Sequence, residues 1–371
     1  MNIALVSAFD YSVDGGVKNH VQELSLQLTS FGHNVDIIAP CSKPNEQYEK
    51  NFIPLGKPIP IHTGGSIARV SIDFRLKYEV QEYLSKKNVD IIHLHQPFSG
   101  LLTAYFISES SSKKIATFHA YGSPWLYRIG GAKLAKPYFE KLDGLIAVSE
   151  PARSFISNYF PGDYTVIPNG VNLKKFKPQV NSIPQYNDHK INILFVGRME
   201  KRKGLRYLLK AYASLRWKYQ NIRLIIVGSE ELDAECNKII NEHSLHDIVI
   251  TGPVSEEKKL EYFSSADIFC TPATGQESFG IVLLEAMASN IPIIATNIDG
   301  YASVVTNQKE ALLVSPKDHL SLEHAIIQII ENPELKLALI ENASKKVKNF
   351  EWNKVAKRIM EFYEKTLQKS G

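Results

Sequence analysis

Short apolar runs alternate with amphipathic stretches along most of this chain, and that alternation limits the fold more than any other feature. The run Ile3–Ser7 is followed by Val17–Phe31, whose apolar residues recur at helical spacing. Gly32 then ends the expected helix, and Val35–Ala39 is the next apolar run. Strands that alternate with helices form a parallel, doubly wound sheet. Further strands of the first half are expected at Val89–His93, Ile115–Phe118, Gly144–Val148 and Tyr164–Ile167.

The second half repeats this order, which predicts a second sheet of the same α/β class. Its expected strands are Asn192–Val196, Arg223–Val227, Ile248–Thr251, Ile268–Cys270 and Ile293–Ala295. Its expected helices are Leu205–Trp217, Leu232–Glu242, Glu256–Ser264, a helix that begins at Ile281, His319–Glu331, Pro333–Phe350 and Trp352–Gln368. A length of 371 residues also suits two domains better than one.

The domain boundaries are expected where the composition changes. Residues 1–171 form the first domain and residues 191–351 the second. The segment 172–190 between them is rich in Pro, Asn, Lys and Gln, which is typical of a linker. A last helix at 352–371 that crosses back to the first domain would suit this plan.

Charge and cysteine content exclude several classes of function. The net charge of +4 permits anionic partners such as nucleotide phosphates or an anionic membrane surface. No dense Lys/Arg run is interleaved with aromatic residues, so no nucleic-acid partner is expected. Cys41, Cys236 and Cys270 are too far apart for a metal cluster and are expected to be free thiols. With no signal peptide and no apolar stretch of about 18 residues, the protein is expected in the cytoplasm.

The strongest motif has two glutamates, Glu277 and Glu285, separated by seven residues. It follows the expected strand Ile268–Cys270, and a helix begins near Gly280. Free backbone N–H groups at such a helix start favour a phosphate. Glu285 could then accept the hydroxyls of a ribose, as acidic residues do in nucleotide sites, while Glu277 lies nearer a sugar. The alternative is a solvated glutamate followed by an amphipathic one.

A second motif, Gly197 to Gly204, directly follows the first strand of the second domain. Ligands bind at the carboxyl ends of strands in open α/β sheets. Arg198 offers a planar fork and Lys203 a compact charge, and together they suit a pyrophosphate. They could neutralise a departing nucleoside diphosphate without a metal. The alternative is a solvated basic loop.

Two further loops of the first half have a weaker signal. Gly16, between the first strand and the first helix, would let the backbone approach a phosphate or sugar closely, although many such turns carry two glycines. His119 ends the run Thr117-Phe118-His119 after another strand. It could donate or accept a hydrogen bond with a sugar hydroxyl, or it could be a satisfied histidine at a strand end.

Together these four elements resemble glycosyltransferase family 4, from Met1 to about Trp352. Within that family the chain is most similar to the phosphatidyl-myo-inositol mannosyltransferases. The matching stretches are Gly15-Gly16-Val17 with His20-Val21, Ala116-Thr117-Phe118-His119, Ala147-Val148-Ser149, Ile167-Pro168-Asn169-Gly170-Val171, the Arg198 and Lys203 loop, and Glu277 to Ala288.

The resemblance implies a GT-B fold, in which two Rossmann-like domains face each other across a cleft. It also implies retention of anomeric configuration, a nucleotide-sugar donor held mainly by the second domain, and no metal or other cofactor. The implied catalytic residues are His119, Arg198, Lys203 and Glu277. The implied donor-binding residues are Gly16, Arg198, Lys203, Val254, Glu256, Lys259, Glu277, Ser278, Phe279, Gly280, Ile281, Val282 and Glu285.

The resemblance also suggests which base and which acceptor are bound. Glu256, beside Val254 and Lys259, could accept two hydrogen bonds from guanine, whereas uracil offers one donor there; a glutamate that complements the helix dipole is the alternative. The implied acceptor-binding residues are Gly64, Gly65, Ser66 and Arg69, with Arg69 as the phosphate ligand. The helix that follows is strongly basic in that subfamily, but here its basic face is diluted by Glu79 and Glu82.

We therefore expect a retaining hexosyltransferase that moves mannose from GDP-mannose to a hydroxyl acceptor, with phosphatidylinositol as one candidate. A peripheral, weak contact with the inner face of the cell membrane would suit that acceptor. The open alternatives are a UDP-sugar donor with a soluble glycan or small-molecule acceptor, a nucleotide-sugar epimerase or glycan phosphorylase of the same architecture, and a non-catalytic nucleotide-sugar or glycan-binding module.

Overall fold

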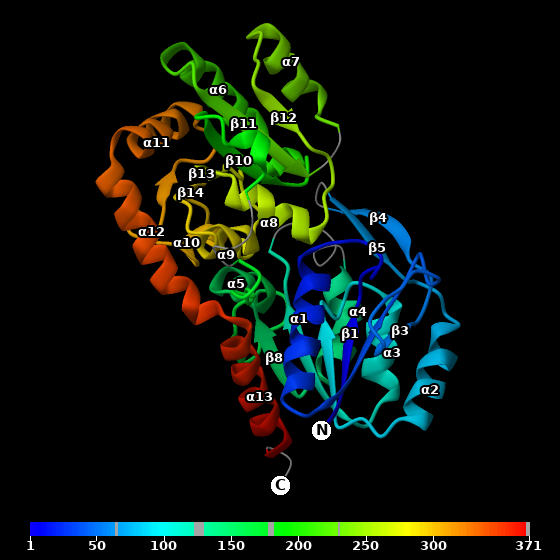
Figure 1. Ribbon diagram of the computed structural model, residues 1–371. Helices are drawn as coiled ribbons and strands as arrows, with labels where there is room; N and C mark the ends of the chain where they lie inside the picture. The colour runs from blue at the N-terminus through cyan, green and yellow to red at the C-terminus, as the bar shows by residue number, and fades with distance from the viewer. Residues whose placement is uncertain (64–65, 122–129, 177–181, 229–230, 369–371) are drawn as a thin grey trace. The chain divides into compact units, whose positions relative to one another are not determined.

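The computed structural model describes residues 1–63, 66–121, 130–176, 182–228 and 231–368. These form two compact units (Figure 1). The first contains Met1–Gly170 together with the segment from Trp352 to the end of the chain, and the second contains Val171–Glu351. No helix in the described part of the chain is both long enough and apolar enough to cross a membrane.

The first unit is built on a seven-stranded parallel sheet. Its strand order is β3-β2-β1-β6-β7-β8-β9, so the chain starts in the interior of the sheet and winds outward in both directions. This confirms the doubly wound sheet expected for the first half. The strands are β1 Asn2–Ser7, β2 Asn34–Ala39, β3 Phe52–Pro54, β6 Ile91–His95, β7 Lys113–Phe118, β8 Gly144–Ala147 and β9 Tyr164–Val166.

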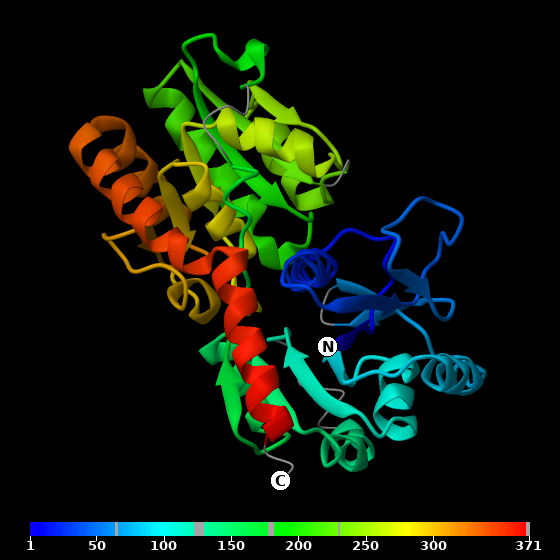
Figure 2. The same cartoon turned by 60° about the horizontal axis from the view of Figure 1, so that its bottom comes forward.

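Six helices of the first unit are α1 Gly16–Ser30, α2 Leu76–Lys86, α3 Leu101–Glu109, α4 Ala132–Phe139, α5 Glu150–Ser157 and α13 Trp352–Gln368. The last of these is distant in sequence yet packs beside α1 and β7 (Figure 2). Its buried residues Val355, Ile359 and Tyr363 share one hydrophobic cluster with Leu24 and Leu28 of α1. The C-terminal helix is thus part of the core of the first unit.

The expected position of the β6 strand was wrong by two residues. It was predicted at Val89–His93, but it runs from Ile91 to His95. The Asp90 carboxylate accepts a hydrogen bond from the Asn2 backbone N–H at 2.7 Å. Asp90 therefore lies just before β6 and is not one of its paired residues. His95 consequently pairs in register with Ser7 at the carboxyl end of the sheet, where ligands bind in this fold.

A separate hairpin of the first unit was also not predicted. Strands β4 Ile59–Thr63 and β5 Ser66–Val70 pair antiparallel. Arg69 was expected to follow a loop, but it lies on a strand of this hairpin. Alternation of apolar and polar residues on both sides of Gly64-Gly65 is the usual hairpin pattern, and it is the sequence signal for this pair of strands. Gly64 and Gly65 themselves lie outside the described residues.

The second unit contains a six-stranded parallel sheet of order β12-β11-β10-β13-β14-β15, which confirms the second Rossmann-like fold. Its strands are β10 Ile191–Gly197, β11 Ile222–Gly228, β12 Ile248–Ile250, β13 Ile268–Thr271, β14 Ile293–Thr296 and β15 Leu312–Val314, and the last was not predicted. Its helices are α6 Leu205–Lys218, α7 Ala234–Glu242, α8 Glu256–Ser264, α9 Ile281–Ala288, α10 Asp299–Ala302, α11 His319–Glu331 and α12 Pro333–Val347.

Helix α12 is shorter than the predicted Pro333–Phe350. The Asn332 side chain caps its start by accepting a hydrogen bond from the Leu335 N–H at 2.9 Å, as the Asn-Pro pair suggested. Its α-helical hydrogen bonding ends at Val347, and a 3-10 turn at Lys348–Phe350 completes the segment.

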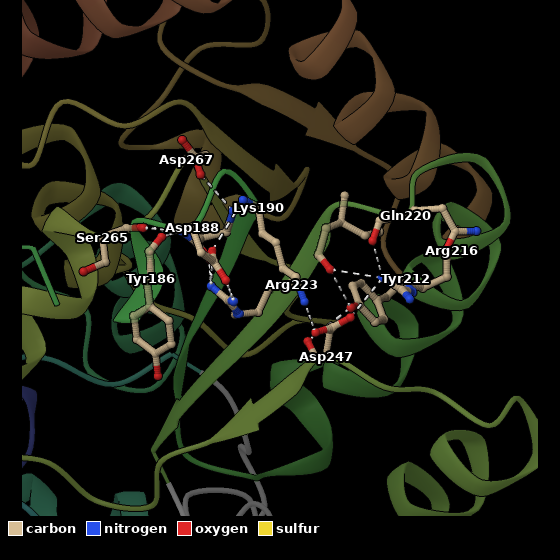
Figure 3. Close-up of polar contacts among 12 residues, drawn as sticks. Tyr186, Asp188, Lys190, Tyr212, Arg216, Gln220, Arg223, Asp247, Ser265 and Asp267 are labelled. Carbon is tan, nitrogen blue, oxygen red and sulfur yellow. Dashed lines mark hydrogen bonds and ion pairs between the residues drawn. The ribbon is translucent and has the colours of Figure 1, made fainter. Parts of the chain in front are cut away.

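Part of the expected linker is held against the second unit by a polar network (Figure 3). The Ile183 N–H donates to the Ser265 hydroxyl at 2.8 Å. Arg223 donates to the Asp188 carboxylate, and its guanidinium lies 5.1 Å from the centre of the Tyr186 ring. Residues 183–188 therefore belong to the folded surface of this unit; residues 177–181 of the expected linker lie outside the described part of the chain.

Candidate functional site

The loop after β10 brings cations to the carboxyl end of the second sheet. Lys203 ends a 3-10 turn, Lys201–Lys203, and Gly204 follows in the left-handed conformation with φ of 74°. A Cβ atom at Gly204 would lie 1.9 Å from the Pro272 carbonyl oxygen. Only glycine therefore lets this loop approach the loop that follows β13.

A series of ion pairs, in which cations and carboxylates alternate, links these two loops. Arg198 pairs with Glu200 at 3.1 Å, and the other oxygen of Glu200 lies 2.7 Å from Arg202 Nε. Arg202 pairs in turn with Glu277, which also accepts Lys203 Nζ at 2.7 Å. Three cations and two carboxylates thus leave one net positive charge, at the place where a pyrophosphate was expected.

Glu277 remains ionised in this setting. Burial by itself raises the pKa of its carboxyl group, but Lys203 and Arg202 outweigh burial and lower that pKa below its ordinary value. The backbone here is closely packed, because a Cβ at Gly300 would lie 2.0 Å from the Glu277 carbonyl oxygen. The carboxylate is therefore a fixed acceptor for hydroxyl groups or cations.

Helix α9 begins at Ile281, shortly after Glu277, and Gly280 at its N-cap has a φ of 93°. The Tyr301 ring packs where a Gly280 Cβ would stand, and the Tyr301 hydroxyl is 2.7 Å from the Thr271 hydroxyl. The first N–H groups of such a helix have no partner within the helix and point toward an anion. Phe279 is buried against Phe350, so its backbone rather than its ring is available for a ligand.

A second charged group lies on α8 and α9. Lys259 Nζ is 2.8 Å from the buried Glu285 carboxylate and 2.9 Å from Glu256. Burial raises the pKa of Glu285, and Lys259 opposes this rise only in part. Val254 is half-buried just before this helix. These four residues are predicted donor ligands, and the Lys259 contacts join three of them.

In the first unit, Gly16 is the exposed first residue of α1, and His119 follows β7. His119 Nε2 lies 3.1 Å from Nδ1 of His95, which ends β6. Nδ1 of His20 donates to Oδ1 of Asn169 at 2.9 Å. Among the described residues, neither His20 Nε2 nor His95 Nε2 has a hydrogen-bond partner.

These three imidazoles are neutral. Desolvation is the largest cause in each case; it lowers the pKa of His20 to about 4 and those of His95 and His119 well below the ordinary value. One ring nitrogen from each lies within 4.8 Å of the others, the single group of this kind in the described part of the chain. Neutral imidazoles can accept from hydroxyl groups, and they are also the donor set that Zn²⁺ prefers.

The predicted acceptor residues are only partly described. Arg69 has an exposed side chain on β5, and its carbonyl oxygen accepts a hydrogen bond from the Asp10 N–H at 2.9 Å. Ser66 begins the same strand. Gly64 and Gly65 lie outside the described residues.

The structure brings Arg198, Lys203 and Glu277 together, and it groups Glu256 with Lys259 and Glu285. Sequence reasoning gave no site role to five residues. Glu200 and Arg202 link Arg198 to Glu277, while His20, His95 and Asn169 belong to the histidine group of the first unit that includes His119. The alternating signs between residues 198 and 203, and the two histidines at the end of β6, were the available signals.

Both units match models of one class of enzyme. Residues 14–175 match the model described as Glycosyltransferase Family 4, and residues 177–346 match Glycosyl transferases group 1. The chain is 31% identical to a phosphatidyl-myo-inositol mannosyltransferase of Mycolicibacterium smegmatis, over 98% of this chain and 94% of that protein. The enzyme of that name from Mycobacterium tuberculosis is also 31% identical, over 100% and 98% of the two chains. The chain therefore belongs to glycosyltransferase family 4 and is a glycosyltransferase.

Solved structures establish the architecture independently. A sucrose-phosphate synthase from Thermosynechococcus elongatus aligns with a TM-score of 0.78 at 22% identity, over 100% of both chains. Anabaena HepE in complex with UDP and glucose aligns with a TM-score of 0.81 at 16% identity, over 98% of this chain and 100% of that one. The fold is accordingly GT-B, as the sequence predicted.

Proposed function

We propose that this glycosyltransferase transfers mannose from GDP-mannose to a hydroxyl of phosphatidylinositol, with retention of anomeric configuration. The observation that carries the proposal is the chain of alternating charges that ends on Glu277, beside the start of α9. Full-length relatives with phosphatidyl-myo-inositol mannosyltransferase as their name support the sugar and the acceptor.

In this proposal the second unit holds the donor. Arg198 and Lys203 bind the pyrophosphate, because a planar fork and a mobile ammonium suit its oxygens. Backbone N–H groups of Ser278, Phe279 and Gly280 and the start of α9, at Ile281 and Val282, supply further donors. Glu277 accepts hydroxyls of the sugar, while Gly16 and His119 of the first unit meet the β-phosphate and the sugar.

The proposed reaction needs no protein nucleophile and no metal. The bond between the sugar anomeric carbon and the β-phosphate oxygen breaks, and the acceptor oxygen forms the new bond on the same face. The acceptor proton passes to an oxygen of the departing phosphate. Negative charge grows on that phosphate, so Arg198 and Lys203 stabilise the transition state more than the ground state.

In this proposal, residues of α8 and α9 bind the base and the ribose. Glu285 accepts the ribose hydroxyls, and Glu256 accepts the N1–H and amino group of guanine beside Val254. Lys259 holds both carboxylates in place, because its ammonium is within 3 Å of each. A guanine that binds here would compete with Lys259 for the Glu256 oxygens.

The first prediction concerns base preference. GDP is expected to stabilise the protein against heat more than UDP at equal concentration, and Glu256→Gln is expected to narrow that difference. An amide accepts with only one oxygen, and bound ligand raises stability in proportion to ln(1 + [L]/Kd). Glu257→Gln on the same helix turn is the matched control. Equal shifts by GDP and UDP in the wild type would exclude guanine reading by Glu256.

A lipid acceptor is supported by the segment that carries Arg69. Described residues between 59 and 78 expose several apolar side chains, among them Phe74 at 78% and Tyr78 at 74%. Exposed apolar side chains together with basic residues suit a membrane surface. The basic charges are nonetheless weakened, because Arg75 pairs with Asp73 and Lys77 with Glu109. We therefore propose weak, peripheral contact with the inner face of the cell membrane.

The second prediction tests this acceptor. With GDP-mannose and vesicles that contain phosphatidylinositol, the wild type is expected to produce mannosylated lipid and to sediment with the vesicles at low salt only. Each basic residue near an anionic surface contributes about 1 kcal/mol. The basic residues of this region, Arg75, Lys77, Lys86 and Lys87, are each paired with an acidic side chain, so they give a weak, salt-sensitive anchor. Arg69→Ala should lower lipid transfer at least tenfold, on the order of one charge-assisted contact.

The matched control for that experiment is Lys57→Ala, a basic residue just before the same hairpin. If the wild type neither sediments at low salt nor produces mannosylated lipid, the acceptor is a soluble glycan or small molecule. Full lipid transfer by Arg69→Ala would instead show that Arg69 is not the phosphate ligand. Loss of transfer in Lys57→Ala to the same degree would show that general surface charge, and not Arg69, is responsible.

A further inference from the structure

Glu277 is held by two cations that differ in kind. Lys203 reaches it with a single ammonium on a flexible stem. Arg202 reaches it with a planar guanidinium that is fixed at two other points as well. Its Nη1 donates to the Gln276 carbonyl oxygen at 3.2 Å, and its Nε lies 2.7 Å from the Glu200 carboxylate.

The backbone of Arg202 strengthens this arrangement. Its carbonyl oxygen accepts hydrogen bonds from the Thr274 N–H at 2.7 Å and from the Thr274 hydroxyl at 3.2 Å. Arg202 thus joins the loop after β10 to the loop after β13 by both its main chain and its side chain. That side chain is 19% exposed, whereas the Arg198 side chain is 59% exposed.

Lys203 and Arg202 are therefore expected to differ in how firmly they stay bound to Glu277 when a donor binds. A pyrophosphate offers Lys203 oxygens with more charge than one carboxylate, so the ammonium turns at least part of its hydrogen bonding to the phosphate. Arg202 keeps its carboxylate and carbonyl partners without moving. Without Arg202, no cation would be fully engaged with the buried Glu277 carboxylate once Lys203 binds the phosphate. A buried carboxylate without a neighbouring cation takes up a proton.

We propose that Arg202 is a positioning residue, which keeps the Glu277 carboxylate ionised and in place for the sugar while Lys203 binds the donor pyrophosphate. This inference rests on the proposed function, in which Glu277 meets the sugar and Lys203 the phosphate. Arg202 acts through Glu277 and does not itself bind the donor.

Few other charged groups face Glu277 among the described residues. Lys203 and Arg202 approach from the loop after β10, and Tyr301 approaches from α10. Burial raises the pKa of the Tyr301 hydroxyl well above its usual value, so Tyr301 stays neutral and cannot replace Arg202. The ionisation of Glu277 therefore depends on Lys203 and Arg202.

The test compares Arg202→Met with Arg206→Met. Arg206 has an equally covered side chain nearby and pairs with Glu235 at 3.2 Å, away from Glu277. Arg202→Met is expected to lower kcat/KM for transfer about tenfold or more and to move the acidic limb of the pH–rate profile upward by about one pH unit, the scale on which one adjacent cation shifts a carboxyl group. Arg206→Met should change neither quantity. Arg202→Lys should restore part of the rate, because it returns the charge without the fork.

A binding measurement separates positioning from direct contact. The nucleoside diphosphate product lacks the sugar, so Arg202→Met should bind it within about twofold of the wild type, whereas Lys203→Ala should bind it far more weakly. If Arg202→Met loses nucleoside diphosphate affinity as Lys203→Ala does, Arg202 is a phosphate ligand and the inference is wrong. An acidic limb that stays in place is equally against it.

A pH titration of Glu277 without turnover distinguishes failure of the inference about Arg202 from failure of the proposed function. The Glu277 carboxyl carbon is followed by ¹³C NMR against pH in the wild type, in Arg202→Met and in a Glu277→Gln variant that assigns the signal. A higher midpoint in Arg202→Met supports the inference even if the donor or acceptor is a different molecule. An unchanged midpoint overturns it even if GDP-mannose is the true donor.

Discussion

Lys203→Ala and Arg198→Ala are each expected to lower kcat/KM by about 30-fold to 1,000-fold, which corresponds to about 2–4 kcal/mol of lost transition-state stabilisation. Both residues lie on the loop after β10, but the structure makes them unequal. Lys203 is largely covered and pairs with Glu277, whereas the Arg198 side chain is mostly exposed and pairs with Glu200. We expect the larger loss in Lys203→Ala, which also leaves Glu277 with Arg202 alone.

The measurement is steady-state transfer from the sugar nucleotide that binds best, with Arg206→Ala as the control on the adjacent helix. Circular dichroism should be unchanged in all three variants, since no substituted side chain belongs to a hydrophobic cluster. Wild-type kcat/KM in both Lys203→Ala and Arg198→Ala would falsify the assignment of this loop to the donor pyrophosphate.

The order of strands and helices could be predicted because it depends on local patterns. Helices α8 and α11 have the bounds that the sequence indicated, and each begins after a residue whose side chain caps it: Ser255 for α8 and Asp318 for α11. Strand β15, Leu312–Val314, could not be predicted in the same way. It has three residues and is a strand only because it pairs with β14, a partner that local sequence does not reveal.

The same distinction explains the candidate site. Arg198, Lys203 and Glu277 could be singled out because each lies in a loop directly after a strand, in a recognisable motif. Arg202 was missed because a charge run normally indicates a solvated surface, and its partner Glu277 lies 75 residues further along the chain. His20 was missed as a site residue for a similar reason, since the Asn169 oxygen that fixes its ring is 149 residues away.

The last helix provides the clearest test of how the first unit is held together. Trp352, at the start of α13, is 4% exposed, and its ring occupies the place where a Gly170 Cβ would stand. The ring also lies edge-on to His20, with centroids 4.9 Å apart. Trp352→Ala would leave a cavity between α13, α1 and the end of the first sheet. Large-to-small changes of this kind cost about 3–5 kcal/mol.

We therefore expect Trp352→Ala to lower the free energy of unfolding of the first unit by that amount and to leave the second unit unchanged. Because a chain of two units can unfold in more than one step, calorimetry that resolves two transitions is the suitable measurement. Trp217→Ala, in the second unit, is the control for loss of a tryptophan that is not buried: its side chain is 89% exposed near the end of α6, so the free energy of unfolding of that unit is expected to change by no more than about 0.5 kcal/mol. If Trp352→Ala changes the free energy of unfolding of the first unit by no more than this amount, α13 does not contribute to the core of the first unit. A large shift in Trp352→Ala alone, accompanied by weaker transfer, would mean that α13 stabilises both that core and the histidine group around His20.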